Sequence, residues 1–121
     1  MLAHSRYRQT QNETASAPRI LVLLLQRARR EMTLADEQLG AHKVREAAPH
    51  TQRALDIVAE LCDSLDAGRA PELAKQLSQV YAFVMERLLV AARGDRKALA
   101  EASRAFAPVA DAFERAVAEG R

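Results

Sequence analysis

The feature that most constrains this chain is an apolar repeat at alternating three- and four-residue steps, which recurs in four segments separated by short polar stretches. Such spacing places the apolar side chains along one face of an α-helix. The sequence therefore predicts four amphipathic helices, approximately at residues 16–39, 43–66, 71–93 and 95–119. The preceding residues, 1–15, are polar and show no sustained period, so they are expected to form an extended or mobile N-terminal arm.

The same repeat identifies the residues expected in the core, because each stripe leaves the charged residues on the opposite face of its helix. The expected core residues are Leu21, Leu25, Ala28, Met32, Ala35 and Leu39 in the first helix, Val44, Ala47, Ala48, Thr51, Leu55, Val58, Cys62 and Leu65 in the second, Leu73, Leu77, Val80, Val84, Leu88 and Ala91 in the third, and Leu99, Ala102, Phe106, Val109, Phe113 and Val117 in the fourth.

Capping residues mark where helices should begin and end. Ser16 is a good N-cap for the first helix, and Asp95 can cap the fourth. Gly40 and Gly94 are placed to end the first and third helices.

Two prolines interrupt the helical pattern. Pro49 falls in the second helix and removes one backbone donor, which predicts either a kink or a late helix start near it. Pro108 falls on the polar side of the fourth helix, where it should bend the helix without emptying the core.

Length and composition set the fold class. A chain of 121 residues fits one domain with a single core. The 49% hydrophobic but only 4% aromatic content indicates a helical protein with a core built from Ala and Leu. Four helices joined by short loops predict an all-α fold, namely an antiparallel up-down-up-down four-helix bundle formed by residues 16–121.

Charge and segment length exclude several function classes. A formal net charge of +2 argues against a protein dedicated to nucleic-acid binding. The apolar run Ile20 to Leu25 is far shorter than the roughly 20 residues that cross a bilayer, so direct membrane insertion is not expected. The N-terminus lacks the apolar core of a signal peptide, and the single Cys62 cannot form an intramolecular disulfide. We therefore expect a cytoplasmic protein.

Residues with catalytic or metal-binding chemistry are few and scattered. No Glu is followed by a His three residues later, the spacing that a di-metal helical bundle uses. His42 and His50 flank the start of the second helix, where a solvated His50 is expected and a phosphotransfer histidine is the weakest alternative. Cys62 continues an apolar stripe and should be a structural thiol. We expect no enzyme and no catalytic, cofactor-binding or metal-binding residues.

Five basic residues of the first two helices and the loop between them form a further candidate site. This basic cluster comprises Arg27, Arg29, Arg30, Lys43 and Arg45. We expect a solvated helix face, with contact to phosphate or to an acidic protein surface as the alternative.

Two helices carry more apolar residues than one core seam needs. The second adds Ala54, Ile57 and Leu61, and the third adds Ala74, Tyr81, Met85 and Leu89. Each helix of a bundle packs against two others, so one explanation of these wide apolar arcs is that they are buried entirely within the core. The other is an apolar groove that binds a partner helix, for which adaptable Met85 and Tyr81 with its polar tip are well suited.

The chain resembles the flagellar export chaperone family FliS, which is specific for flagellin, in two stretches: ETASAPRILVLLL at Glu13 to Leu25 and SLDAGRAPELAKQLSQVYAFVMERLLVA at Ser64 to Ala91. The family pattern has a Tyr in the arm, Thr-Ala-Ser-Pro leading into a Leu-rich first helix, Leu-Asp at the end of the second helix, and Leu-Ala-x-x-Leu-x-x-x-Tyr in the third. In this chain the proline stands one position later, at Pro18. The matching positions here are Tyr7, Thr14, Ala15, Ser16, Leu65, Asp66, Leu73, Ala74, Leu77 and Tyr81.

This resemblance implies a cytoplasmic chaperone without a cofactor that binds the disordered C-terminal segment of flagellin, prevents premature polymerisation and assists delivery to the flagellar type III export apparatus. The export-gate membrane protein and other flagellar regulators are further candidate partners, and the free protein would be a monomer or weak dimer. The alternative is another non-enzymatic helical adaptor with a different client. The expected client-binding groove comprises Tyr7, Ile20, Ala54, Ile57, Leu61, Ala74, Tyr81, Met85 and Leu89.

We hypothesise that the arm, through Tyr7, lies over part of this groove when no client is present, because Tyr7 is the main large apolar group of the arm. Tyr7→Ala should therefore change both client affinity, measured by calorimetry, and arm mobility, measured by NMR relaxation. An unchanged value for both would rule this hypothesis out.

Overall fold

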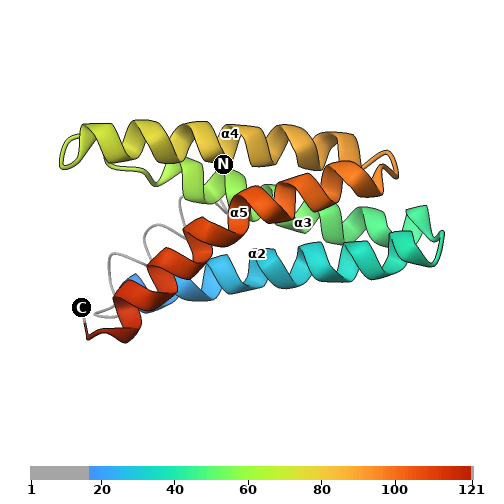
Figure 1. The fold of residues 1–121 in the computed structure, drawn as a ribbon, viewed down its shortest axis with the longest axis horizontal. Helices are drawn as coiled ribbons and strands as arrows, with labels where there is room; N and C mark the ends of the chain where they lie inside the picture. The colour runs from blue at the N-terminus through green and yellow to red at the C-terminus, as the bar shows by residue number, and fades with distance from the viewer. Residues whose placement is uncertain (1–16, 121) are drawn as a thin grey trace, which may run out of the picture.

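The computed structural model describes residues 17–120, which form an antiparallel bundle of four helices without a strand in that range (Figure 1). The helices are α2 (Ala17–Gly40), α3 (Val44–Asp63), α4 (Pro71–Ala91) and α5 (Arg96–Ala118). The four-helix bundle predicted from the apolar repeat is confirmed. The expected arm, residues 1–15, and the Ser16 cap lie outside the described residues.

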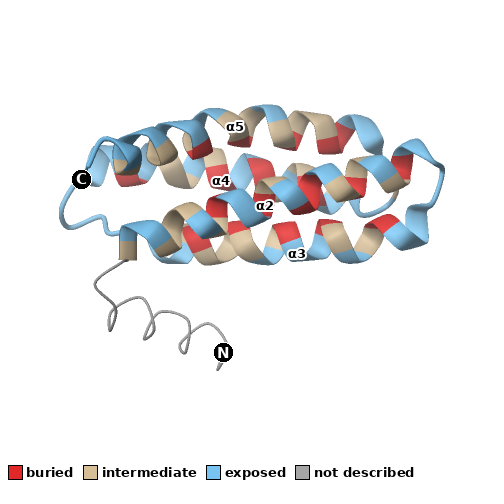
Figure 2. Cartoon of the chain, turned by 90° about the horizontal axis from the view of Figure 1, so that it is seen from below, coloured by how far each residue is buried: buried red, intermediate tan, exposed pale blue. Residues whose placement is uncertain are grey.

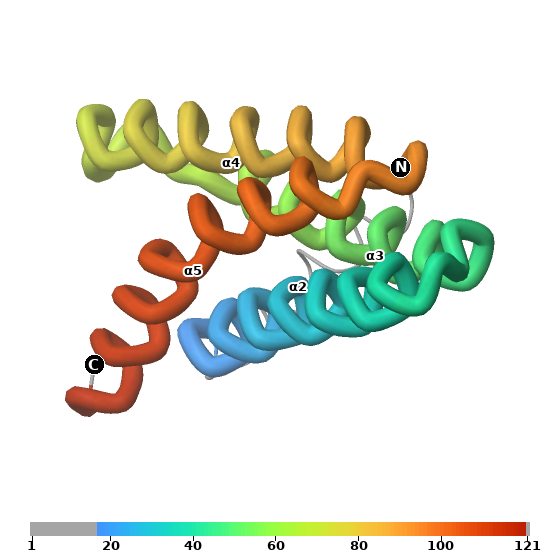
Figure 3. Tube along the Cα trace, turned by 45° about the vertical axis from the view of Figure 1, so that its right-hand side comes forward, coloured from blue at the N-terminus to red at the C-terminus, as the bar shows by residue number. Residues whose placement is uncertain are grey.

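The helices pack as a ring in which each has two neighbours. α2 packs against α3 and α5, and α4 packs against the same two helices (Figure 3). Buried residues occupy the sides of the helices that face one another, so the core runs along the long axis of the bundle (Figure 2). Each helix therefore has to bury an arc that covers two neighbours instead of one narrow stripe.

The expected stripes of α2 and α5 are largely confirmed. Leu25, Ala28, Met32, Ala35 and Leu39 are buried in α2, and Leu99, Ala102 and Phe106 are buried in α5. Pro108 lies on the exposed side of α5, as predicted.

The stripes of α3 and α4 are partly wrong. Val44 and Leu73 were expected in the core but are 43% and 52% exposed. Ala54 and Tyr81, which were expected beside the core stripes and not in them, are 0% and 2% exposed. Because both helices carry wide apolar arcs, the repeat does not show which row of side chains faces the bundle axis, and that choice depends on the neighbouring helices.

The helix ends agree with the capping pattern. Asp95 caps α5 through its Oδ1, which accepts a hydrogen bond of 3.0 Å from the backbone N–H of Ala98. Gly94 has a φ of +104°, a left-handed conformation that favours glycine. Helix α2 ends at Gly40, as predicted, and α3 begins at Val44, ahead of Pro49, so a late start of α3 at this proline is wrong.

Ion pairs fix α5 to α2. Arg96, at the start of α5, donates two hydrogen bonds to Asp36 of α2, at 2.8 and 3.1 Å. Farther along, Arg29 of α2 donates to Asp111 of α5 at 2.7 Å. The basic cluster is therefore not simply a solvated face, since Arg29 is committed to an ion pair across a helix interface.

A buried carboxylate, Glu31, ties α2 to α3. It is 3% exposed and accepts hydrogen bonds from Arg27 at 2.8 Å and from His50 of α3 at 2.7 Å, with Arg53 Nε at 3.3 Å. A carboxylate can only accept, so His50 Nδ1 must carry the proton. The nitrogen of Arg53 that lies 3.1 Å from the same Nδ1 is therefore a close neighbour and not a hydrogen-bond donor to it.

This arrangement corrects the expectation for His50 and sets the charge of Glu31. His50 is not a solvated side chain, because it is partly buried and bonded to Glu31. Burial alone would raise the pKa of Glu31, but the hydrogen bonds from His50, Arg27 and Arg53 outweigh it and lower that pKa to about 2. Glu31 is thus ionised at neutral pH and stabilises the α2–α3 interface.

We expect Glu31→Gln to lower the free energy of unfolding at neutral pH by on the order of 1–3 kcal/mol, because charge-assisted hydrogen bonds to a buried group are lost. The pKa of Glu31 is about 2 in the folded chain against an ordinary 4.5, so its contribution is complete above about 4.5 and is lost as the pH falls towards 2. The stability difference between the wild type and the variant should shrink across this interval in urea unfolding at a series of pH values.

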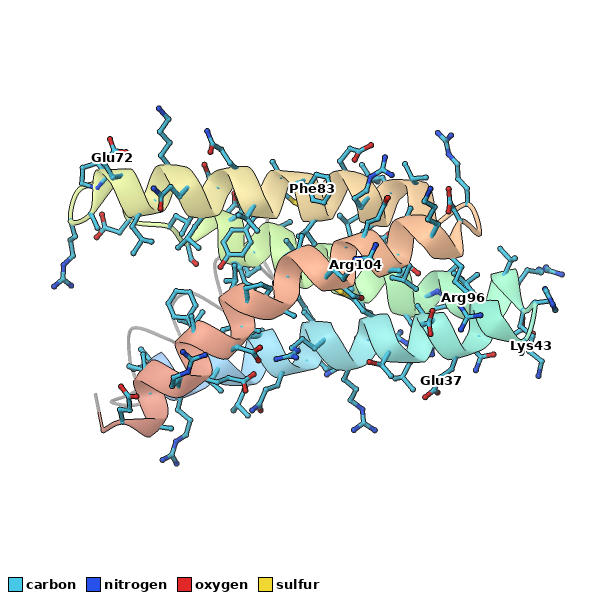
Figure 4. All side chains as sticks on the ribbon, in the orientation of Figure 1. Glu37, Lys43, Glu72, Phe83, Arg96 and Arg104 are labelled. Atoms are coloured by element: carbon cyan, nitrogen blue, oxygen red, sulfur yellow. The ribbon has the colours of Figure 1, made fainter. Side chains whose placement is uncertain are left out.

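The matched control is Glu37→Gln, which changes an exposed carboxylate on the same helix (Figure 4). It should leave the stability near that of the wild type. A Glu31→Gln difference that stays constant from neutral pH to pH 2 would contradict the assigned role of the charge.

Candidate functional site

An apolar groove opens where α4 and α5 diverge. Towards its C-terminal end α5 runs away from α4 and approaches the start of α2 (Figures 1 and 3). Two adjoining cavities, of about 490 and 380 Å³, lie in this part of the bundle and share Leu73, Leu77 and Phe113. We refer to the two together as the α4–α5 groove.

The larger cavity lies at the end of the bundle that holds the α3–α4 loop. The residues that line it come from all four helices and from that loop: Leu21, Leu61, Ser64, Leu65, Asp66, Arg69, Ala70, Leu73, Ala74, Leu77, Tyr81 and Phe113. Most of them are apolar, and the polar ones, apart from Tyr81, belong to the stretch that connects α3 to α4.

The smaller cavity is apolar throughout. It is lined by Leu73, Leu77, Pro108, Val109, Ala112, Phe113 and Ala116. Ala112 and Ala116 have short side chains, which leaves space between α5 and the leucines of α4. The groove therefore results from small residues on one helix facing large residues on the other.

The connection between α3 and α4 positions the mouth of the larger cavity. Asp66 Oδ1 accepts a hydrogen bond of 3.0 Å from the backbone N–H of Gly68, an Asx-type turn. Pro71 then begins α4, where its fixed φ suits the first helical turn. Leu73 and Leu77 follow in the first two turns of α4, so they sit next to this opening.

Tyr81, which lines the larger cavity, and its neighbour Cys62 are titratable groups with a raised pKa. Burial raises the pKa of Tyr81 to about 12, with a smaller contribution from the neighbouring Cys62. Burial also raises the pKa of the Cys62 thiol, and the Asp63 carboxylate adds to this effect. Both groups are neutral at physiological pH, so neither is an activated nucleophile.

Three of the nine residues expected in the client-binding groove come together here. Leu61, Ala74 and Tyr81 all line the larger cavity. All three are also buried, so they form its floor and not its rim.

The other expected groove residues lie elsewhere. Ile57 lines a separate cavity of about 240 Å³ between α2 and α3, and Ala54 is buried in the core. Ile20 and Met85 are partly buried, and Leu89 is exposed, but none of the three lines the α4–α5 groove. Tyr7 lies outside the described residues.

Other residues that line the groove were expected in the core. Leu21, Leu65, Leu77, Val109 and Phe113 are partly buried, because each packs against the core on one side and lines the groove on the other. The feature of the sequence that could have identified these residues is their position along α4 and α5. In an antiparallel pair, the first turns of α4 lie opposite the last turns of α5, where Ala112 and Ala116 interrupt the row of large side chains.

Residues 17–120 contain no group of three or more His, Cys, Asp or Glu side chains that could hold a metal ion. None of the four described helices is both long enough and apolar enough to span a membrane.

A family model described as flagellar protein FliS matches residues 1–120. No curated protein matches the chain.

Proposed function

This chain belongs to the FliS family of flagellar proteins, and from that membership we propose that it is a flagellin-specific export chaperone. The family indicates a flagellar chaperone role. In our proposal the chain binds the disordered C-terminal segment of flagellin in the cytoplasm, prevents its premature polymerisation and assists its delivery to the flagellar type III export apparatus. The groove between α4 and α5 is the proposed client site.

The observation that carries this proposal is the apolar lining of the α4–α5 groove. Leu73 and Leu77 lie one turn apart on α4, and Val109 and Phe113 lie one turn apart on α5. Two such rows can receive side chains from a third helix whose anchors are spaced by three and four residues. Leu73 is more than half exposed, so a docked helix would remove apolar surface from water.

The energetics suit a client that folds on binding. A disordered segment has to lose conformational entropy when it becomes helical, and the burial of apolar surface offsets this cost. Coupled folding and binding of this kind buries about 1,000–3,000 Å² and gives a negative change in heat capacity. Cavities of about 490 and 380 Å³ accommodate several side chains of such a segment but not all of it, so other parts of the client would lie on the outer surface.

The test is calorimetric titration of the full chain with a peptide of about the last 40 residues of flagellin from the same organism, long enough to form helices that span the groove. We expect one-to-one binding, a negative change in heat capacity and a gain of helix in circular dichroism. Leu77→Ala should weaken binding about 10- to 100-fold, because burial of a Leu side chain contributes about 1.5–3 kcal/mol.

The matched control is Leu88→Ala on the same helix, which lies in the core and outside the groove. It should cost about 2–5 kcal/mol of stability without a direct effect on the binding surface. If neither the peptide nor full-length flagellin binds, the proposal is wrong, and a helical adaptor with a different client takes its place. Binding that is insensitive to Leu77→Ala would place the client on another surface.

A further inference from the structure

Tyr81 occupies an unusual position at the floor of the larger cavity. It is the largest of the buried side chains, and it comes from α4 one turn after Leu77. The other residues of this cavity that come from helices are all apolar, namely Leu21, Leu61, Leu73, Ala74, Leu77 and Phe113, whereas the polar Ser64, Asp66 and Arg69 belong to the connection between α3 and α4. A phenol in such surroundings normally bonds its hydroxyl to a protein group or an ordered water.

The Tyr81 hydroxyl has no hydrogen-bond partner within residues 17–120. The oxygen is not sealed in the core either, because it is not one of the unpaired polar side-chain atoms in the described residues that are fully inaccessible. An unpaired oxygen that is accessible and belongs to a side chain lining a cavity faces that cavity. The neighbouring Cys62 is only a weak hydrogen-bonding group and does not replace a partner.

The chemistry of this position restricts what can bind there. The hydroxyl is a neutral donor at physiological pH, because burial holds its pKa near 12. A charged side chain brought to the same depth would lose its hydration and find no opposite charge among the apolar residues of the floor. A purely apolar side chain would exclude water from the hydroxyl and leave it unpaired. A neutral amide or hydroxyl side chain satisfies both conditions.

We propose that the Tyr81 hydroxyl is the specificity contact of the α4–α5 groove, where it donates a hydrogen bond to a neutral amide or hydroxyl side chain of the bound client segment. This inference rests on the proposed function. The groove then selects a segment with one Asn, Gln, Ser or Thr among its apolar anchors. Sites built to pair a polar group reject an analogue that lacks it more strongly than apolar pockets reject a missing methylene.

The decisive variant is Tyr81→Phe, which removes only the hydroxyl. In the free protein no hydrogen bond is lost, so the stability in urea unfolding should be unchanged or higher. The affinity for the flagellin peptide should fall about 5- to 100-fold in calorimetry, because the client group is left unpaired in the closed groove. If the hydroxyl had a structural role instead, Tyr81→Phe would lower the stability and leave the affinity for the peptide unchanged.

A double-mutant cycle identifies the partner. Each Asn, Gln, Ser and Thr of the peptide is replaced in turn by Ala, and each variant peptide is titrated against the wild type and Tyr81→Phe. One peptide position should lose most of its effect in the Tyr81→Phe background, whereas the other positions should act independently of it. The matched aromatic control is Phe83→Leu on the same helix, since Phe83 is exposed in the middle of α4 and does not line the groove (Figure 4). This control should leave the affinity unchanged.

The outcomes separate the two proposals. If the wild type does not bind the peptide, the proposed function fails, and this inference fails with it. If the wild type binds and Tyr81→Phe binds equally well, only the specificity contact is wrong. A loss of stability in Tyr81→Phe would show that the hydroxyl is bonded within the free chain, residues 1–16 included, and would also overturn the inference.

Discussion

The bundle depends on close packing of each helix against two neighbours around a core in which about half of the buried apolar residues are alanines. Alanine lets helix backbones approach closely. Along α2 and α3 the buried alanines are Ala28, Ala35, Ala47 and Ala54. Larger side chains, such as Tyr81, Leu88 and Phe106, fill the space where α4 and α5 complete the ring. A core of this kind has little spare volume, so the positions of α4 and α5 relative to each other decide where a cavity can form.

The groove follows from how α5 is held. Arg96 attaches the start of α5 to α2, and Arg87 of α4 reaches Glu101 of α5 at 2.9 Å, so the first half of α5 is fixed to both neighbours. Beyond that half, Arg29 holds Asp111 to α2, and α5 leaves α4. The alanines near its end cannot bridge the resulting gap. The apolar surface of Leu73 and Leu77 thereby lines a cavity and is not covered by α5.

The buried polar groups divide into two types. Glu31 has its partners within the chain, since Arg27, His50 and Arg53 surround it, and it contributes to stability. The Tyr81 hydroxyl has none within residues 17–120 and faces a cavity. A satisfied buried group fixes an interface, whereas an unsatisfied group in an open cavity is available to a ligand. This difference is why we place the specificity contact at Tyr81 and not at the more strongly charged cluster.

The sequence by itself determined the fold class, the number of helices in the described range, their approximate ends and the core faces of α2 and α5, because a narrow apolar stripe has only one way to face a core. The resemblance of the sequence to the FliS family was confirmed by the family model that matches residues 1–120. Only the tertiary structure decided which rows of α3 and α4 are buried, since a wide arc can be turned either way until its neighbours are in place. It also decided that Glu31 is paired with His50, a contact between residues on different helices that no local pattern indicates. The groove is likewise a tertiary property, because it exists only where α4 and α5 diverge, and the local pattern of neither helix shows that divergence.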